Sequence, residues 1–96
     1  MLSAVDAKIS RIVDVEVTED TLTFHLEDGR SVSAPIDWYP RLVYATSEER
    51  RNFRLIGRGE GVHWPDLDED ISAAGVLEGL PSREGPESFK RWLEAR

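Results

Sequence analysis

Residues 11–36 read RIVDVEVTEDTLTFHLEDGRSVSAPI, and this stretch decides the fold. From Val13 to Val17, valines alternate with polar residues, which is the period of a strand with one wet face. A second alternating run covers residues 21–27. A third follows Asp28-Gly29, a pair that favours a tight hairpin turn because glycine accepts positive φ. The stretch therefore predicts three antiparallel strands that share one apolar face.

The middle of the chain predicts short helices and further strands. Pro40 is expected to open a helical turn. Thr46 and Glu49 have the spacing of a capping box, which predicts a helix over about residues 47–53. Short strands are expected at residues 54–56 and 62–64, on either side of a glycine-rich loop.

The acidic residues that follow are expected to cap another helix. Asp68 or Asp70 fits the N-cap of a helix over residues 71–78, because acidic side chains favour the positive end of a helix. Gly79 is expected to end that helix. The fold class predicted is therefore α+β, a small antiparallel β-meander packed with short helices.

The end of the chain predicts a linker and a C-terminal helix. Pro81, Ser82 and Gly85 mark the linker, and Pro86 suits the first position of a helix. Apolar residues then recur at helical spacing, which gives the helix one apolar stripe. We expect an α+β domain over residues 1–79, with the linker and helix over residues 80–96.

The composition of the chain limits the classes of function that it can have. The chain has 96 residues, no cysteine and a net charge of −7. Disulfides, thiolate chemistry and cysteine zinc sites are excluded. Nucleic-acid binding is disfavoured because the phosphate backbone attracts cationic proteins, whereas this chain is acidic. A cationic protein partner is easier to accommodate, although the acidity also serves solubility. No apolar run approaches the roughly 20 residues needed to span a membrane, and no signal-peptide pattern is present, so we expect a cytoplasmic protein.

Two motifs invite a ligand interpretation. The loop Gly57-Arg58-Gly59-Glu60-Gly61 resembles a phosphate loop, but it lacks the following Lys-Ser or Lys-Thr, so a hairpin loop is expected. Asp66, Asp68 and Asp70 resemble the start of a calcium loop, but Ile71 and Leu77 stand where glycine and glutamate are needed. A small-ligand or metal site of His63 with residues 66–70 stays open beside the capping interpretation.

Catalysis has no clear set of residues in this sequence. His25 and His63 are far apart, and neither is paired with a recognisable nucleophile. We therefore expect a protein that is not an enzyme and that uses no cofactor.

Aromatic and charged residues suggest an interaction surface instead, because tryptophan and arginine are common at interfaces. Core packing is nevertheless the expected role of at least two of the three tryptophans, and the alternative for the arginines is that they pair with residues 66–70. On a helix, Arg50 and Arg54 would share a face. The candidate interaction surface consists of Trp38, Arg41, Arg50, His63, Trp64, Asp68, Glu69 and Asp70.

Several segments of the chain resemble a bacterial family, the domain of unknown function 2442. The resemblance runs from about Ile12 to Gly79. Its most specific part is residues 63–72, HWPDLDEDIS, and it is supported by the segments at 28–30, 35–42, 45–46, 49–53 and the glycines at 57, 59 and 61. The tail after Leu80 lies outside it.

The resemblance implies an α+β domain with a small antiparallel sheet, and it implies no known reaction. Such proteins look like companions of another short protein, in an arrangement similar to toxin–antitoxin pairs. Some relatives carry an additional helix-turn-helix domain, for which the 17 residues after Gly79 leave no room. The leading hypothesis is thus a protein-binding module with an antitoxin-like role, whose partner is a small protein from a neighbouring gene. Self-association, the ligand or metal site, and DNA binding through residues 41–54 are the alternatives.

Overall fold

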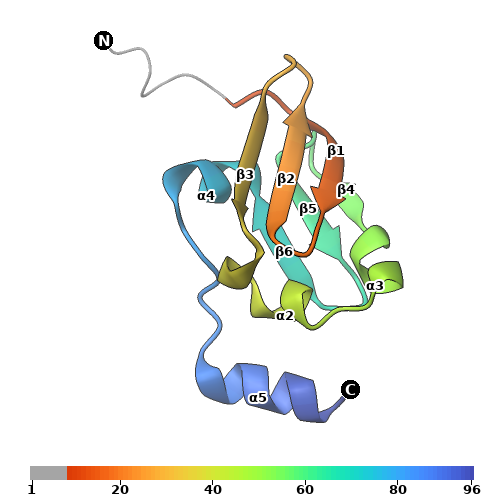
Figure 1. The fold of residues 1–96 in the computed structure, drawn as a ribbon. Helices are drawn as coiled ribbons and strands as arrows, with labels where there is room; N and C mark the ends of the chain where they lie inside the picture. Colours follow the sequence, from red (N-terminus) through yellow and green to blue (C-terminus); the bar gives the residue numbers. More distant parts are fainter. Residues whose placement is uncertain (1–8) are drawn as a thin grey trace.

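The three strands expected in the first half form one antiparallel sheet, and a second three-stranded antiparallel sheet lies behind it (Figure 1). The computed structural model describes residues 9–96. The α+β prediction is confirmed. The strands and helices are β1 (Ile12–Val17), β2 (Thr21–Leu26), β3 (Ser31–Pro35), the 3-10 helix η1 (Ile36–Trp38), α2 (Pro40–Val43), α3 (Ser47–Arg51), β4 (Arg54–Ile56), β5 (Gly61–Trp64), β6 (Glu69–Ser72), α4 (Ala73–Glu78) and α5 (Pro86–Glu94).

The first sheet contains a β-bulge that the alternation of residues does not show. β1 pairs with β2 from Ile12 opposite Leu26, but the register shifts by the next pair, Asp14 opposite His25. The extra residue is Val13, and its side chain is 47% exposed. Ile12, rather than Val13, is therefore the buried residue at the start of β1.

The second sheet corrects the helix expected at residues 71–78. Residues 69–72 form β6, which pairs antiparallel with β5. The helix begins at Ala73, and Ser72 is its N-cap, with the Ser72 hydroxyl accepting from the Gly75 N–H at 2.9 Å. Capping by Asp68 or Asp70 was thus wrong, because the pairing with β5 holds this segment extended. Gly79 ends α4 in the left-handed conformation, as expected.

The core lies between the two sheets. It is formed by apolar residues from both sheets and from η1, α2 and α4. The Ile12 N–H donates to the Gly59 carbonyl at 2.7 Å and joins β1 to the β4–β5 loop. Gly59 has φ +85, and a Cβ there would lie 2.8 Å from the Ile12 carbonyl oxygen. The close approach of the two sheets therefore requires glycine at position 59.

The C-terminal helix α5 packs at the end of the molecule beyond α2 (Figure 1). Phe89 stacks on Trp92 with ring centroids 5.7 Å apart. The Tyr44 ring is tilted against the Phe89 ring, with centroids 5.5 Å apart. The Arg96 guanidinium lies 4.5 Å from the centroid of the Trp92 ring and pairs with Glu49 at 2.7 Å. The expected terminal helix is confirmed and packs on the helices of its own chain. The division of the chain at residue 80 stays a prediction.

Candidate functional site

Trp64, one of the residues expected on an interaction surface, lies in the core. Its side chain is fully buried. Its indole Nε1 donates to the Arg50 carbonyl at 3.0 Å, and its ring packs against Phe53 with centroids 6.3 Å apart. Trp38 is half-buried against the same core. Trp64 is therefore a structural residue in this fold and reaches no partner.

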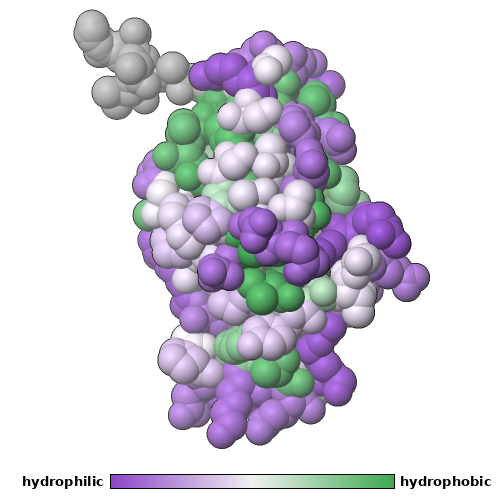
Figure 2. Space-filling view, viewed as in Figure 1, coloured by the Kyte–Doolittle hydropathy of each residue, from purple (hydrophilic) through white to green (hydrophobic). Residues whose placement is uncertain are grey.

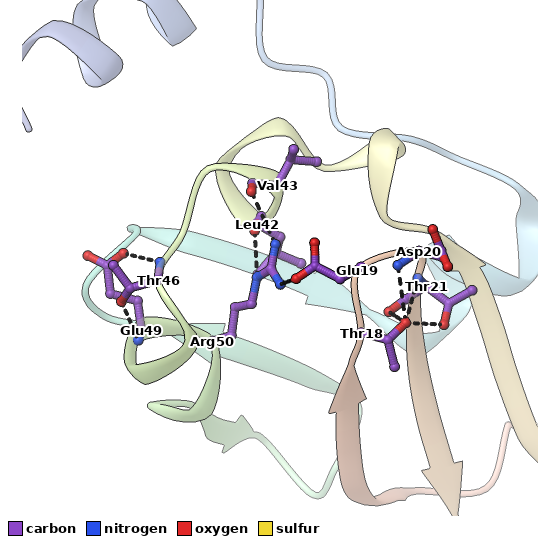
Figure 3. Close-up of polar contacts among 9 residues, drawn as sticks. All are labelled: Thr18, Glu19, Asp20, Thr21, Leu42, Val43, Thr46, Glu49 and Arg50. Atoms are coloured by element: carbon purple, nitrogen blue, oxygen red, sulfur yellow. Dashed lines mark hydrogen bonds and ion pairs between the residues drawn. The ribbon is translucent and has the colours of Figure 1, made fainter.

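Arg50 is also directed into the protein. Figure 3 shows its guanidinium bound to the carbonyls of Leu42 and Val43, at 2.9 and 3.1 Å, with Glu19 at 3.7 Å. Its expected pairing with residues 66–70 was wrong. Arg54 begins β4, so the two arginines do not share a helix face. The contacts of Arg50 fasten α3 to α2, which leaves little of its charge for a phosphate.

Arg41, on α2, also binds groups of its own chain. Its guanidinium donates to the Glu84 carboxylate from two nitrogens and to the Leu67 carbonyl at 2.7 Å. It also lies 5.1 Å from the centroid of the Trp92 ring. The Arg41 and Glu84 side chains are only 15% and 10% exposed. The ion pair expected with residues 66–70 is therefore made with Glu84 instead.

The polar residues expected around His63 lie in different directions. His63 shares a hydrogen bond with Asp70, its cross-strand neighbour on β6. Strand alternation turns Glu69 to the opposite face, where it is partly buried. Asp68 is exposed and occupies the preceding turn with φ 51. Within residues 9–96, no three of the His, Cys, Asp and Glu side chains come together as a group that could hold a metal ion.

A different surface stands out, and we call it the open face. It consists of Val13 on β1, Leu55 on β4 and Arg58 in the loop that follows β4. β1 and β4 are edge strands of their sheets, and they lie on the same side of the molecule (Figure 1). A hollow of about 280 Å³ between them is lined by residues that include Val13, Leu55 and Arg58.

The open face combines exposed apolar side chains with free positive charge. Val13 is 47% exposed and Leu55 is 40% exposed. Figure 2 shows green apolar surface at the right-hand margin, where Figure 1 places β1 and β4, while the front of the first sheet is pale or purple. Arg58 forms no ion pair with any residue in the described part of the chain. No pattern in the sequence indicates this surface, because the bulge and the edge position of β4 depend on strand pairing.

Comparison with known families gives the context for this geometry. Residues 12–82 match the family described as protein of unknown function DUF2442. The chain belongs to this family. Comparison with curated proteins finds no match.

Two solved structures share the DUF2442 fold of this chain. A crystal structure of a protein of unknown function from Rhodospirillum rubrum has a TM-score of 0.64 and 24% identity, over 77% of this chain and 92% of that one. The NMR structure of an uncharacterized protein from Chromobacterium violaceum has a TM-score of 0.63 and 27% identity, over 85% of this chain and 75% of that one.

Within residues 9–96 of this DUF2442 domain, no helix is long and apolar enough to cross a membrane.

Proposed function

We propose that this DUF2442 domain is a protein-binding module without catalytic activity, and that its open face is the binding surface. The observation that carries the proposal is that two exposed apolar side chains, Val13 and Leu55, line one hollow between two neighbouring sheet edges. Exposed apolar groups of this kind, rimmed by polar residues, are typical of protein–protein interaction sites. Val13 and Leu55 would supply the apolar centre of the contact.

The charge of the open face indicates the chemistry of the partner. Arg58 lines the hollow and has no ion pair within residues 9–96, in a chain of net charge −7. We propose an acidic segment with apolar anchor residues as the occupant, because opposite charges across an interface select the partner and speed association. This replaces the cationic partner suggested by the overall charge, since the local charge of the surface decides which partner fits.

A role as the antitoxin-like half of a two-protein system is the finer form of this proposal. It is supported by the family resemblance alone. The partner would then be a small protein from a neighbouring gene, in the cytoplasm.

DNA binding has less support. Arg41 and Arg50, two of the arginines on which it depended, are bound to Glu84 and to backbone carbonyls.

The test compares the full chain with two pairs of variants as bait in native lysate. Leu55→Asp places a charge in the open face, and Leu77→Asp is its control, because Leu77 is 61% exposed on α4 at the opposite side of the molecule. Arg58→Glu is paired in the same way with Lys90→Glu, at an exposed position of α5. We expect one acidic protein to be retained by the wild type and both controls and to be lost with Leu55→Asp and Arg58→Glu. Retention of the same proteins by all five baits would contradict the proposal.

Light scattering of the pure chain tests the other possible occupant of the open face, which is a second copy of this chain. A dimer that Leu55→Asp dissociates and Leu77→Asp preserves would show that a second copy covers the open face. That result would overturn the acidic partner.

A further inference from the structure

The open face continues into a longer groove along the edge of β1. The hollow of the open face is lined by residues 11–13, at the start of β1, and by residues between 55 and 59. A second hollow, of about 370 Å³, is lined by residues at the other end of β1, by residues of α3 and by Phe53, which precedes β4. The two hollows thus follow one another along both walls, and we call them together the edge groove. β1 has six residues, so an extended peptide of similar length, about 20 Å, matches the groove.

The β1 wall of the edge groove carries backbone groups without a partner. β1 is an edge strand, and the residues of a strand direct their N–H and carbonyl groups alternately to its two sides. The Thr18 N–H donates to the Thr21 carbonyl at 2.9 Å, so Val17 and Val15 direct theirs away from β2. Within residues 9–96, the Val17 N–H and carbonyl make no hydrogen bond, and the Val15 N–H is bound only by the Asp14 carboxylate, at 2.9 Å. Such an edge is a template for a further strand.

The lining of the edge groove is positively charged, although the chain is acidic. Four arginines and one acidic residue line the two hollows, namely Arg11, Arg50, Arg51, Arg58 and Glu19. Arg11 pairs with Glu27, and Arg50 lies 3.7 Å from Glu19 (Figure 3). Arg58 in one hollow and Arg51 in the other form no ion pair in the described part of the chain. An extended occupant therefore meets free positive charge in both halves of the groove.

The other face of β1 has the opposite charge. Asp14 and Glu16 are exposed there, because they alternate with the valines that line the groove. Like charges on neighbouring strands destabilise their pairing. A strand added to β1 would therefore carry its acidic side chains on the groove side and neutral ones on the outer side.

We propose that the acidic partner segment binds in the edge groove as an added β-strand that pairs with β1, which rests on the function proposed above. Its main chain forms hydrogen bonds with Val15 and Val17, and its alternate side chains enter the groove and give specificity. The groove-facing positions read acidic, apolar, acidic, because Arg58 and Arg51 attract the carboxylates and the valines contact the apolar residue. The positions between them are neutral.

A single-stranded nucleic acid is the other extended polyanion. Its binding sites rely on exposed aromatic side chains on which the bases stack. Phe53 is the one aromatic residue that lines the two hollows, and it packs against the core. The observations therefore favour a peptide.

The test is an NMR titration of the full, ¹⁵N-labelled chain with the peptide acetyl-TETVTET-amide, which has the proposed pattern. We expect saturable shifts at the amides of residues 13–17 and 51–55. The peptide concentration needed is on the order of 1 mM, because a free peptide loses affinity when it becomes ordered. The control peptide acetyl-TKTVTKT-amide reverses the charge and should cause no saturable shift. Equal binding of the two peptides, no saturation with either, or tighter binding of a ten-residue thymidine oligonucleotide at the same amides would overturn the proposal.

Val17 distinguishes strand pairing from a contact of side chains alone. Val17→Pro removes the N–H that points into the groove and leaves the ladder with β2, and proline is tolerated on edge strands. This variant should bind the acidic peptide roughly 5-fold more weakly or worse, since a hydrogen bond is lost. Val17→Thr keeps the amide and the shape, and it should bind as the wild type does. Equal affinity of the two variants would overturn the pairing.

Hydrogen exchange of the wild type gives the same answer if Val17→Pro does not fold. At saturating peptide, exchange of the Val17 N–H should slow by roughly 10-fold, while the amides of β3 keep their rates. Shifts at Val13 and Leu55 with unchanged exchange at Val17 would overturn the added strand and leave the open face as a binding surface. Failure of the proposed function is seen separately, in the lysate baits. A dimer that Val17→Pro dissociates would show that β1 of a second copy occupies the groove, and it would overturn the acidic partner.

Discussion

The Arg41 guanidinium meets the Glu84 carboxylate side-on, through Nε and Nη2, and this pair joins α2 to the segment ahead of α5. Ser88, in the first turns of α5, donates its hydroxyl to the same carboxylate at 2.8 Å. The Trp92 ring lies against the other side of the Arg41 guanidinium. One buried ion pair therefore positions both the C-terminal helix and the segment that leads to it.

Glu84→Gln is expected to loosen α5. The variant leaves Arg41 buried without its counter-charge, which costs about 2–3 kcal/mol. Amide hydrogen exchange in α5 should then become roughly 30-fold faster or more, while exchange in β2 and β5 stays unchanged. Glu87→Gln is the control, because the Glu87 side chain is 93% exposed and its ion pair with Arg91 is 4.0 Å long. Equal exchange in the two variants would show that the Arg41–Glu84 pair does not hold the helix.

The same ion pair should make the docking of α5 sensitive to acid. The hydrogen bond from Arg41 lowers the pKa of Glu84 below its ordinary value, and the bond from Ser88 adds to this effect. A carboxyl with a lowered pKa in the folded state contributes stability above its unfolded pKa and loses it as the pH falls through the folded value. Exchange in α5 should therefore accelerate as the pH is lowered below about 4, after correction for the intrinsic rate. A constant protection factor down to pH 3 would contradict this.

Gly59→Ala is expected to destabilise the whole domain. A Cβ at this position would lie 2.8 Å from the Ile12 carbonyl oxygen, and φ is +85. Alanine therefore forces the two sheets apart and is strained, at a cost of at least about 2 kcal/mol in the free energy of unfolding. Gly29→Ala is the matched control, with a positive φ of +94 but no atom within 4 Å of the added Cβ. Urea denaturation should give a clearly lower midpoint for Gly59→Ala, and similar midpoints would rule out the close approach as the cause.

Glu69 should make the domain less stable as the pH rises. Its pKa is raised to about 7 in the folded state, chiefly by burial. A carboxyl with a raised pKa binds more protons in the folded state, so stability is lost between its unfolded pKa and about 7. After allowance for partial exposure, the loss is on the order of 1–2 kcal/mol. Thermal unfolding should show that Glu69→Gln is more stable than the wild type at pH 8 and similar to it at pH 4.5. A Glu69→Gln variant that is less stable at pH 8 would contradict this.

The sequence predicted those parts of the fold that depend on local signals. The alternation in residues 11–36 gave three strands, and Thr46 with Glu49 forms the expected capping box (Figure 3). Gly79 ends α4 in the left-handed conformation because few other residues accept it. In each case the residues that decide the structure lie within a few positions of one another.

The failures concern contacts between distant parts of the chain. Asp68 and Asp70 have the composition of a helix cap, but the pairing of residues 69–72 with β5 makes that segment a strand. Glu84 lies 43 residues from Arg41, so no local pattern indicates their ion pair. Trp64 fits both a core and an interface, and only its place in the second sheet shows that it is buried. The open face was missed for the same reason.

The most direct test of the central claim, that the open face binds an acidic protein segment, is site-specific photocrosslinking in the native cell. A benzoylphenylalanine is placed at position 55 in one variant of the full chain and at position 77 in another, because both leucines are exposed and lie on opposite sides of the molecule. Mass spectrometry then identifies each adduct and the crosslinked peptide. We expect an adduct from position 55 alone, to an acidic segment of another protein. Adducts of equal yield from both positions, or from position 77 alone, would contradict the claim.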